Sequence, residues 1–392
     1  MEQQLSELPE GWEFQNLGSV AKLVGGATPS KKEKSYWGGS IPWASVRDLN
    51  VDNLEKTEFK ITEEGLESCS SNLIPSGNLV IATRVGLGKV SRTKVSVAIN
   101  QDLRGVIPNK NADVDYLFFW FKQNAGYIES NGTGATVKGV KIDFIKSLEI
   151  PLPPLNEQKR IVAKLAALLT RIDAAITQLQ ETLELSRALF ASALDEAFRG
   201  CEAARVSLTE VVDFIGGSQP PKSEFSEVAH DGYVRLIQIR DYKTDAHVVY
   251  VNAESTKKFC KEDDVMIGRY GPPVFQILRG LEGAYNVALM KASPDEDVLN
   301  KDYLFWFLQS PSIQGYIVGL SQRAAGQSGV NKKALEKYEI PLPSLDEQVR
   351  IVEHFEVLND RSRTLEAETR ERLEQLTTLK SSLLDSAFRG QL

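Results

Sequence analysis

Cysteine and histidine are the side chains that most often act as nucleophiles, general bases or metal ligands, and this 392-residue chain has three of each. All of them stand singly in the sequence: Cys69, Cys201, Cys260, His230, His247 and His354. An odd number of cysteines without C-x-x-C spacing argues against both a disulfide framework and a zinc site. The histidines do not form an H-E-x-x-H motif. The sequence therefore predicts no metal site and favours a reducing environment.

The motifs that would bind a cofactor or act on a base are incomplete. The stretch GPPV at 271–274 has the prolines of the N/D-P-P-Y/F box of amino-methyltransferases, but glycine replaces the polar first residue that would hold the target amine. The stretches GLGKVS and GTGATV do not complete G-x-G-x-x-G, and no G-x-x-x-x-G-K-[ST] is present. We therefore expect no catalysis by this chain and no cofactor bound to it.

Basic side chains gather locally, although the chain as a whole is acidic. Its net charge is −7, from 46 basic and 53 acidic residues, and this balance does not by itself indicate nucleic-acid binding. Between residues 79 and 110, basic side chains accompany a single acid, Asp102. These basic residues are Arg84, Lys89, Arg92, Lys94, Arg104 and Lys110. The segment is suited to contacts with DNA phosphates, and the alternative is a solvent-exposed hairpin.

Two further segments, TGATVKGVK at 133–141 and RAAGQSGVNKK at 323–333, are basic and rich in small residues. Arg, Lys, Gln and Asn are the side chains that read base edges and phosphates. The candidate DNA contacts are Lys31, Lys32, Arg47, Arg84, Lys89, Arg92, Lys94, Lys138, Lys141, Lys222, Arg235, Arg240, Arg269, Gln276, Arg279, Arg323, Gln327, Asn331 and Lys332. Tyr36, Trp37 and Trp43 lie near Lys31 and Lys32, and we expect these aromatic residues to be core residues rather than stacking platforms.

The elements that must position these residues occur twice. IPLPPLNEQKRIV at 150–162 is nearly repeated as IPLPSLDEQVRIV at 340–352, and AFRG follows each copy at the same distance. The upstream regions correspond more loosely: YLFFWF at 116–121 resembles YLFWFL at 303–308, and VRDL at 46–49 resembles IRDY at 239–242. The chain therefore consists of a variable domain followed by a constant segment, twice.

Each constant segment predicts a long amphipathic helix. Apolar residues three or four apart run along the first copy and continue as Phe190, Ala193 and Ala197: Ile161, Leu165, Leu168, Ile172, Ile176, Leu179 and Leu183. The second copy has Phe355, Leu358, Leu365, Leu373, Leu376, Leu383 and Ala387. Asn156 and Asp346 are the expected N-caps, and Gly200 and Gly390 are the expected stops. Since neither helix can bury its stripe alone, we expect an antiparallel pair; the alternative is that each helix packs on its own domain.

The variable segments predict an α+β fold. Glycines punctuate short β-like runs such as NLVIATRV, and a helical pattern occurs mainly in VDYLFFWFKQ and DYLFWFLQ. The N-terminus MEQQLSELPEGW has neither the basic nor the apolar region of a signal peptide, and no run of about 18 apolar residues is present. We expect a cytoplasmic protein without a membrane span.

Together these motifs resemble the specificity (S) subunit of type I restriction–modification systems. The resemblance is carried by the doubled IPLPxLxEQxRIV…AFRG, by the opening LPEGWEFQNLGSVAKLVGGATPSKKEKSYWGGSIPW and by TGAT before the first helix, and it covers nearly the whole chain. The second unit departs from the pattern, with GGSQPPKSEF in place of GGATPSKKEK and RAAGQS in place of GTGATV. These departures indicate that the second unit reads a different half-site.

The resemblance implies two α/β target recognition domains, at 1–154 and 201–344, and two spacer helices, at 155–200 and 345–392, that form an antiparallel coiled coil in a pseudo-two-fold repeat. It implies partners as well: double-stranded DNA, two methyltransferase (M) subunits that would bind S-adenosylmethionine, and restriction/translocase (R) subunits. Such a complex methylates DNA and defends the cell against phage. Two alternatives from other classes remain, a self-contained DNA methyltransferase or nuclease and a coiled-coil adaptor that binds only proteins.

Overall fold

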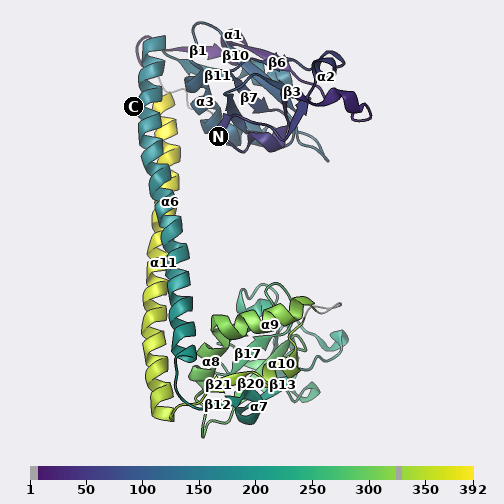
Figure 1. The fold of residues 1–392 in the computed structure, drawn as a ribbon, viewed down its shortest axis with the longest axis vertical. Helices are drawn as coiled ribbons and strands as arrows, with labels where there is room; N and C mark the ends of the chain where they lie inside the picture. Colours follow the sequence, from purple (N-terminus) through teal and green to yellow (C-terminus); the bar gives the residue numbers. More distant parts are fainter. Residues whose placement is uncertain (1–7, 324–328) are drawn as a thin grey trace. The chain divides into compact units, whose positions relative to one another are not determined.

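The computed structural model describes residues 8–323 and 329–392, with the backbone alone at 322 and 323. By contacts the chain divides into two compact units, one of Met1–Gln178 with Glu371–Leu392 and one of Leu179–Arg370. The division passes through both long helices, so each unit contains one variable domain together with part of each helix. The two units are described separately below (Figure 1).

Unit 1 contains two principal sheets. The larger has the strand order β2-β10-β7-β8-β4, and its strands are β2 (Ala21–Gly25), β10 (Leu103–Pro108), β7 (Leu79–Ala82), β8 (Val90–Thr93) and β4 (Asn53–Leu54). The other has the order β5-β3-β9-β6, from β5 (Phe59–Ile61), β3 (Trp37–Ala44), β9 (Val97–Ile99) and β6 (Leu73–Ile74). Strands β3 and β9 are parallel, and the other pairs of this sheet are antiparallel. Strands β1 (Glu13–Asn16) and β11 (Glu149–Leu152) form a two-stranded antiparallel sheet, and β11 ends just before the first long helix.

Helix α3 (Val114–Gln123) is the centre of the core of unit 1. Asp113 caps it, because its carboxylate accepts hydrogen bonds from two backbone N–H groups of the first turn. Every residue from Tyr116 to Phe121 is buried, and these side chains pack against both long helices. The short helices of the unit are α1 (Leu17–Val20), α2 (Glu63–Glu67), α4 (Ala125–Ser130) and α5 (Ile142–Ser147).

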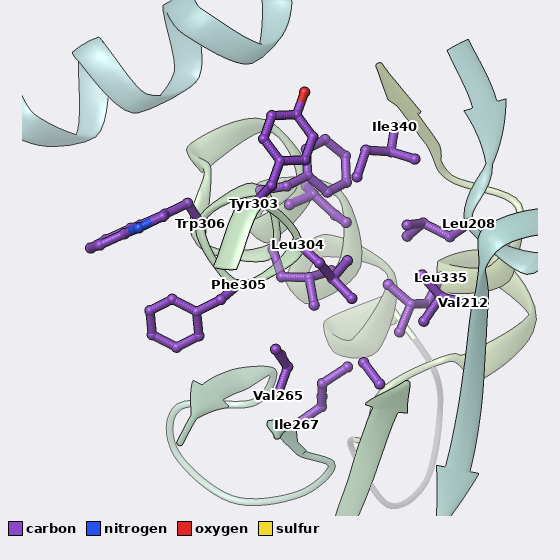
Figure 2. Packing of buried hydrophobic residues seen from close by; sticks show 14 of the residues in the cluster. Leu208, Val212, Val265, Ile267, Tyr303, Leu304, Phe305, Trp306, Leu335 and Ile340 are labelled. Atoms are coloured by element: carbon purple, nitrogen blue, oxygen red, sulfur yellow. The ribbon is translucent and has the colours of Figure 1, made fainter. Parts of the chain in front are cut away.

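Unit 2 repeats this plan with different loops. Its sheets have the orders β13-β20-β17-β18 and β15-β14-β19-β16, and β14 and β19 are parallel as β3 and β9 are. The strands are β12 (Arg205–Ser207), β13 (Val212–Gly216), β14 (Tyr233–Ile237), β15 (Tyr250–Asn252), β16 (Phe259–Cys260), β17 (Val265–Gly268), β18 (Gln276–Leu278), β19 (Gly283–Tyr285), β20 (Leu289–Pro294) and β21 (Glu339–Pro341). The helices are α7 (Leu208–Val211), α8 (Lys301–Gln309), α9 (Pro311–Arg323) and α10 (Lys332–Glu336). Figure 2 shows Leu304 of α8 near the middle of this core with Tyr303 above it, while Trp306 extends to the left edge of the cluster.

The long helices α6 (Leu155–Arg199) and α11 (Leu345–Phe388) have 45 and 44 residues, and 45 residues of helix extend over about 67 Å. They lie side by side in Figure 1, and side-chain contacts give their direction within each unit. In unit 1, Arg160 contacts Leu392 and Asp173 pairs with Lys380. In unit 2, Arg187 pairs with Glu366, and the Phe198 and Phe355 rings stack. Since higher positions of α6 meet lower positions of α11 in both units, the helices are antiparallel.

The predicted fold class is confirmed: two α+β domains, repeated in sequence, are combined with two long antiparallel helices. The buried stripe of α6 differs by one position at three places. Leu169, Leu194 and Phe198 are buried, whereas the predicted Leu168, Ala193 and Ala197 are half-buried. At these places α6 packs on a domain as well as on α11, so the neighbouring position is the buried one.

The predicted helix ends require two corrections. Both helices begin at Leu155 and Leu345, two residues earlier than caps at Asn156 and Asp346 would require, so these two residues lie in the first turn and are not N-caps. Pro154 precedes α6 directly, a position where the missing N–H of proline costs nothing. At the far ends, Gly390 has the positive φ of +72° expected of a helix stop, whereas Gly200 is not among the residues with positive φ.

Candidate nucleic-acid interface

A buried glutamine fastens the start of each long helix to its domain. In unit 1, Gln158 of α6 is fully buried, and its side-chain oxygen accepts a hydrogen bond of 2.8 Å from the backbone N–H of Asp113, the N-cap of α3. Its amide group donates to the carbonyl oxygens of Asn111 and Pro153, at 2.9 and 2.8 Å. This side chain therefore joins three segments: α6, the proline-rich strand exit and the start of α3.

Unit 2 has the same arrangement. Gln348 of α11 is fully buried and accepts a hydrogen bond of 2.7 Å from the N–H of Asn300, the N-cap of α8. Its amide group donates to the carbonyl oxygens of Val298 and Pro343, at 2.9 and 3.0 Å. Buried polar groups are stabilising only when their partners are in place. The EQ pair of the repeated sequence is thus explained locally, since its glutamine holds helix and domain together.

A tyrosine from the central helix of each unit, α3 or α8, adds a hydrogen bond to the proline-rich strand that precedes the long helix. The hydroxyl of Tyr116 donates to the carbonyl oxygen of Pro151, and that of Tyr303 donates to Pro341 at 2.9 Å. Burial raises the pKa of both phenols well above the ordinary value, so both stay neutral donors. Figure 2 shows Tyr303 and Ile340 on the same side of the core.

An arginine stacked on the central helix is also repeated. In unit 2 the Arg279 guanidinium is 2.5 Å from a carboxylate oxygen of Asp302 and lies 3.9 Å from the ring centroid of Phe305. In unit 1, Arg92 pairs with Asp115 and lies 3.5 Å from the centroid of Phe118. Each arginine precedes its aspartate by 23 residues. The structure therefore gives Arg92 and Arg279, both candidate DNA contacts, an intramolecular role.

Two of the predicted basic segments come together in unit 1. The backbone of Thr83, Arg84 and Val85 hydrogen-bonds with the segment that contains Lys138 and Gly139. The Arg84 side chain is 52% exposed and lies 3.5 Å from Asp102. The loop after β7 and the loop before α5 thus lie side by side, and Arg84 and Lys138 are both exposed on them.

The corresponding loops of unit 2 meet in the same way. Tyr270 bridges to Gly329, and the N–H of Val330 donates to the carbonyl oxygen of Arg269 at 2.9 Å. Asn331 uses its side chain to cap α10, and Lys332 pairs with Glu336 at 3.4 Å. Gln327 and the side chain of Arg323, both predicted contacts, lie outside the described residues. The part of this loop pair that the structure describes thus repeats the backbone pairing of unit 1.

The remaining candidates are distributed over the surfaces of the two domains. Lys31, Lys32, Lys94, Lys141 and Lys222 are exposed. Lys89 donates to the side chain of Asn50, Gln276 donates to the carbonyl of Pro273, and Arg240 donates to that of His247. Arg47 and Arg235 pair with Glu58 and Asp245, at 3.9 and 2.7 Å. No bound DNA tests these assignments, and they remain predictions.

Four residues that position this surface were not predicted from the sequence. Gln158 and Gln348 stand inside the repeated motif, and Asp115 and Asp302 follow Arg92 and Arg279 at one fixed spacing. The signal that could have found both pairs is a polar residue at the same place in each copy of the repeat. The described residues hold no group of three or more His, Cys, Asp or Glu side chains that could bind a metal ion. Within the same part of the chain, no helix combines the length and apolar character that crossing a membrane requires.

Comparison with known proteins gives the family. A family model for the type I restriction modification DNA specificity domain matches twice, at residues 9–185 and 202–375. The chain belongs to this family. Each match begins at a variable domain and continues into a long helix, so the family unit coincides with the repeat that the sequence shows.

Relatives match either part of the chain or nearly all of it. The EcoR124I/EcoR124II specificity subunit of Escherichia coli is 36% identical over 41% of this chain and 41% of its own. The EcoKI specificity subunit of Escherichia coli is 25% identical over 98% of this chain and 90% of its own. Two specificity subunits share more than 30% identity with this chain. In each of them the match to this chain covers about two fifths of the subunit's own length.

A solved structure from a study of complex assembly and conformational transition of the type I restriction–modification system has the same fold. It aligns with a TM-score of 0.81 over 99% of this chain and 100% of its own, at 24% identity. This likeness concerns the fold.

Proposed function

We propose that this chain is the DNA specificity subunit of a type I restriction–modification complex. Each domain reads one half of a bipartite, asymmetric DNA site, and the paired helices set the spacing of the halves and dock two M subunits. The chain has no active site of its own, and S-adenosylmethionine binds to M. R subunits complete a complex that restricts foreign DNA in the cytoplasm.

One observation carries this proposal: the two units share the contacts that join domain to helix but differ in their outer loops. Gln158 and Gln348 make matching hydrogen bonds, and so do Tyr116 and Tyr303. The loops at 133–141 and 323–333 differ in length and sequence. A protein that reads two different half-sites from one framework needs this combination of constant ties and variable loops.

Exchange of one domain tests this directly. Residues 201–340 would be replaced by the matching segment of another specificity subunit, with Gln348 and the rest of α11 retained. Methylome sequencing of cells that express the exchanged chain with its M subunit should show one altered half-site and one unaltered. The matched control replaces the first domain and should alter only the other half. If both halves change in either exchange, the domains do not read independently.

A further inference from the structure

An aromatic pocket opens on unit 1 beside the amino end of β3. Trp37, Trp43 and Phe59 line it together with Lys31, and its volume is about 270 Å³. The rings meet edge to face: the two indole centroids are 5.2 Å apart at 82°, and Phe59 is 6.1 Å from Trp37 at 80°. Trp43 is 5% exposed whereas Phe59 is 45% exposed, so the pocket is deep on one side and open on the other. Both tryptophans belong to one core cluster, in which Trp43 is buried and Trp37 packs against it half-buried, and the same rings also line the pocket.

Hydrogen bonds hold the two indoles in place. The Trp37 N–H donates to the carbonyl oxygen of Ser30, and the Trp43 N–H donates to that of Ala27, both at 3.1 Å. Strand β3 also passes close to its neighbour at Gly39, where a Cβ would lie 2.4 Å from the carbonyl oxygen of Ile61. Because both N–H groups are already used, only ring faces and edges remain for a ligand. The pocket is preorganised for a flat or apolar group.

The charge around the pocket restricts the class of ligand. Lys31 in the pocket wall is exposed, as are Lys32 and Lys34 after it in the sequence, and none of the three forms an ion pair with a residue that the structure describes. Glu33, which lies among them, uses its carboxylate to accept hydrogen bonds from Ser35. Aromatic cages commonly take quaternary ammonium groups, but a lysine in the wall repels a cation. A ring attached to an anion suits both the aromatic walls and the lysines.

We propose that this pocket binds an unpaired nucleobase of the DNA, with Lys31 placed for a flanking phosphate. Stacking of bases on aromatic side chains is the usual way that proteins hold unpaired nucleotides. A volume just below the range of about 300–1,000 Å³ typical of ligand sites fits one base. Enzymes that methylate a base in duplex DNA extrude it into their own active site, so in the proposed complex M takes the extruded base and the base opposite is left unpaired. The proposal deepens the proposed function and rests on it.

Among the described residues of unit 2, the position that corresponds to Trp43 does not contribute an aromatic ring to such a pocket. Leu236, which stands before the repeated turn where Trp43 stands in unit 1, is fully buried. Phe259 of unit 2 is 40% exposed on a short strand, much as Phe59 is, but no other aromatic ring is recorded against it. The contact is therefore expected on one half of the DNA site only. Phe259 also offers a matched control.

The test compares a labelled oligothymidylate of roughly ten nucleotides with an abasic strand of equal length, which keeps the phosphates and removes the bases. Binding to the full chain is followed by fluorescence anisotropy at fixed salt. The unaltered chain should bind the base-bearing strand about tenfold more tightly. Phe59→Leu should remove most of this preference while the affinity for the abasic strand stays the same. Phe259→Leu should leave both affinities unchanged.

Three outcomes would overturn the pocket as a base site. One is equal binding of the two strands by the unaltered chain. Another is a Phe59→Leu loss that is the same for both strands, and the third is competition by tetramethylammonium, which would indicate a cation cage. Thermal unfolding of the variants separates folding defects from binding defects. Failure of the proposed function has its own readout: the methylated genomic motif, offered as duplex, would compete no better than motif-free duplex.

Discussion

The two units agree in their interiors and differ at their surfaces. Sheet orders β2-β10-β7-β8 and β13-β20-β17-β18 correspond strand by strand, and so do β5-β3-β9-β6 and β15-β14-β19-β16. The ties from helix to domain also correspond, through Gln158 and Gln348. At the surface, however, unit 1 has an edge strand, β4, that has no counterpart among the described strands of unit 2, and Trp43 of its aromatic pocket is replaced by Leu236 there. The attachment of a domain to its helix is the same in both units. The differences between the units lie on the surfaces that we expect to contact DNA.

The largest effect should follow from breaking the repeated attachment. Gln348→Leu would leave the Asn300 N–H and two carbonyl oxygens without their side-chain partner, and each buried unpaired group costs about 1–3 kcal/mol. We expect unit 2 to lose about 2–4 kcal/mol of unfolding free energy, and Gln158→Leu to do the same in unit 1. Hydrogen exchange measured by mass spectrometry reports each unit separately.

The matched control is Gln180→Leu, which changes an exposed glutamine of α6. This substitution should change the unfolding free energy, as measured by hydrogen exchange, by no more than about 0.5 kcal/mol. If Gln158→Leu and Gln348→Leu loosen their units to clearly different extents, the two attachments are not equivalent. If neither does more than the control, the buried hydrogen bonds are not what joins helix and domain.

The repeat explains how far the sequence could predict this fold. Two copies of one motif with equal spacing were enough to predict two domains, two helices and their antiparallel direction. The apolar stripe of α6 was predicted to include Leu168, whereas its neighbour is the buried residue. Spacing alone does not decide between neighbouring leucines when a helix packs on both a domain and another helix. The N-caps were wrong because Asn156 and Asp346 are good capping residues by type, while the prolines and backbone carbonyls before them fix the actual start.

The site was less predictable than the fold for a physical reason. Basic residue types indicate affinity for phosphate, but their partners depend on tertiary contacts. Arg92 and Arg84 stand in the same basic segment, yet Arg92 lies on Phe118 beside Asp115 whereas Arg84 is half exposed. Arg92 contacts residues of helix α3, outside the segment, whereas Arg84 lies beside Asp102 of its own segment. Composition therefore located the segment but not the function of each side chain.

The stacked arginines should give the next largest effect, and it should be on stability. Arg279→Met removes the pair with Asp302 and the stacking on Phe305, and the side chain is only 32% exposed. We expect a loss of about 1–2 kcal/mol in unit 2, and a similar loss for Arg92→Met in unit 1. Chemical denaturation measures both. Arg279→Lys, which keeps the charge but not the planar group, should recover only part of the loss.

The smallest effect should come from Arg84, and it should be on DNA binding without a loss of stability. Its side chain is 52% exposed and lies 3.5 Å from Asp102, so its removal leaves no buried group unpaired. If Arg84 contacts a phosphate, Arg84→Ala should weaken binding to all DNA sequences alike. It should also flatten the dependence of log affinity on log salt by about 0.9.

Arg361→Ala, which removes an exposed arginine of α11, should leave the slope unchanged. A loss confined to one DNA sequence would assign Arg84 to base reading, and an unchanged slope and affinity would assign its loop to plain solvent exposure. The phosphate result would separate the two arginines by function. Arg84 would contact DNA, whereas the stacked Arg92 would stabilise the domain.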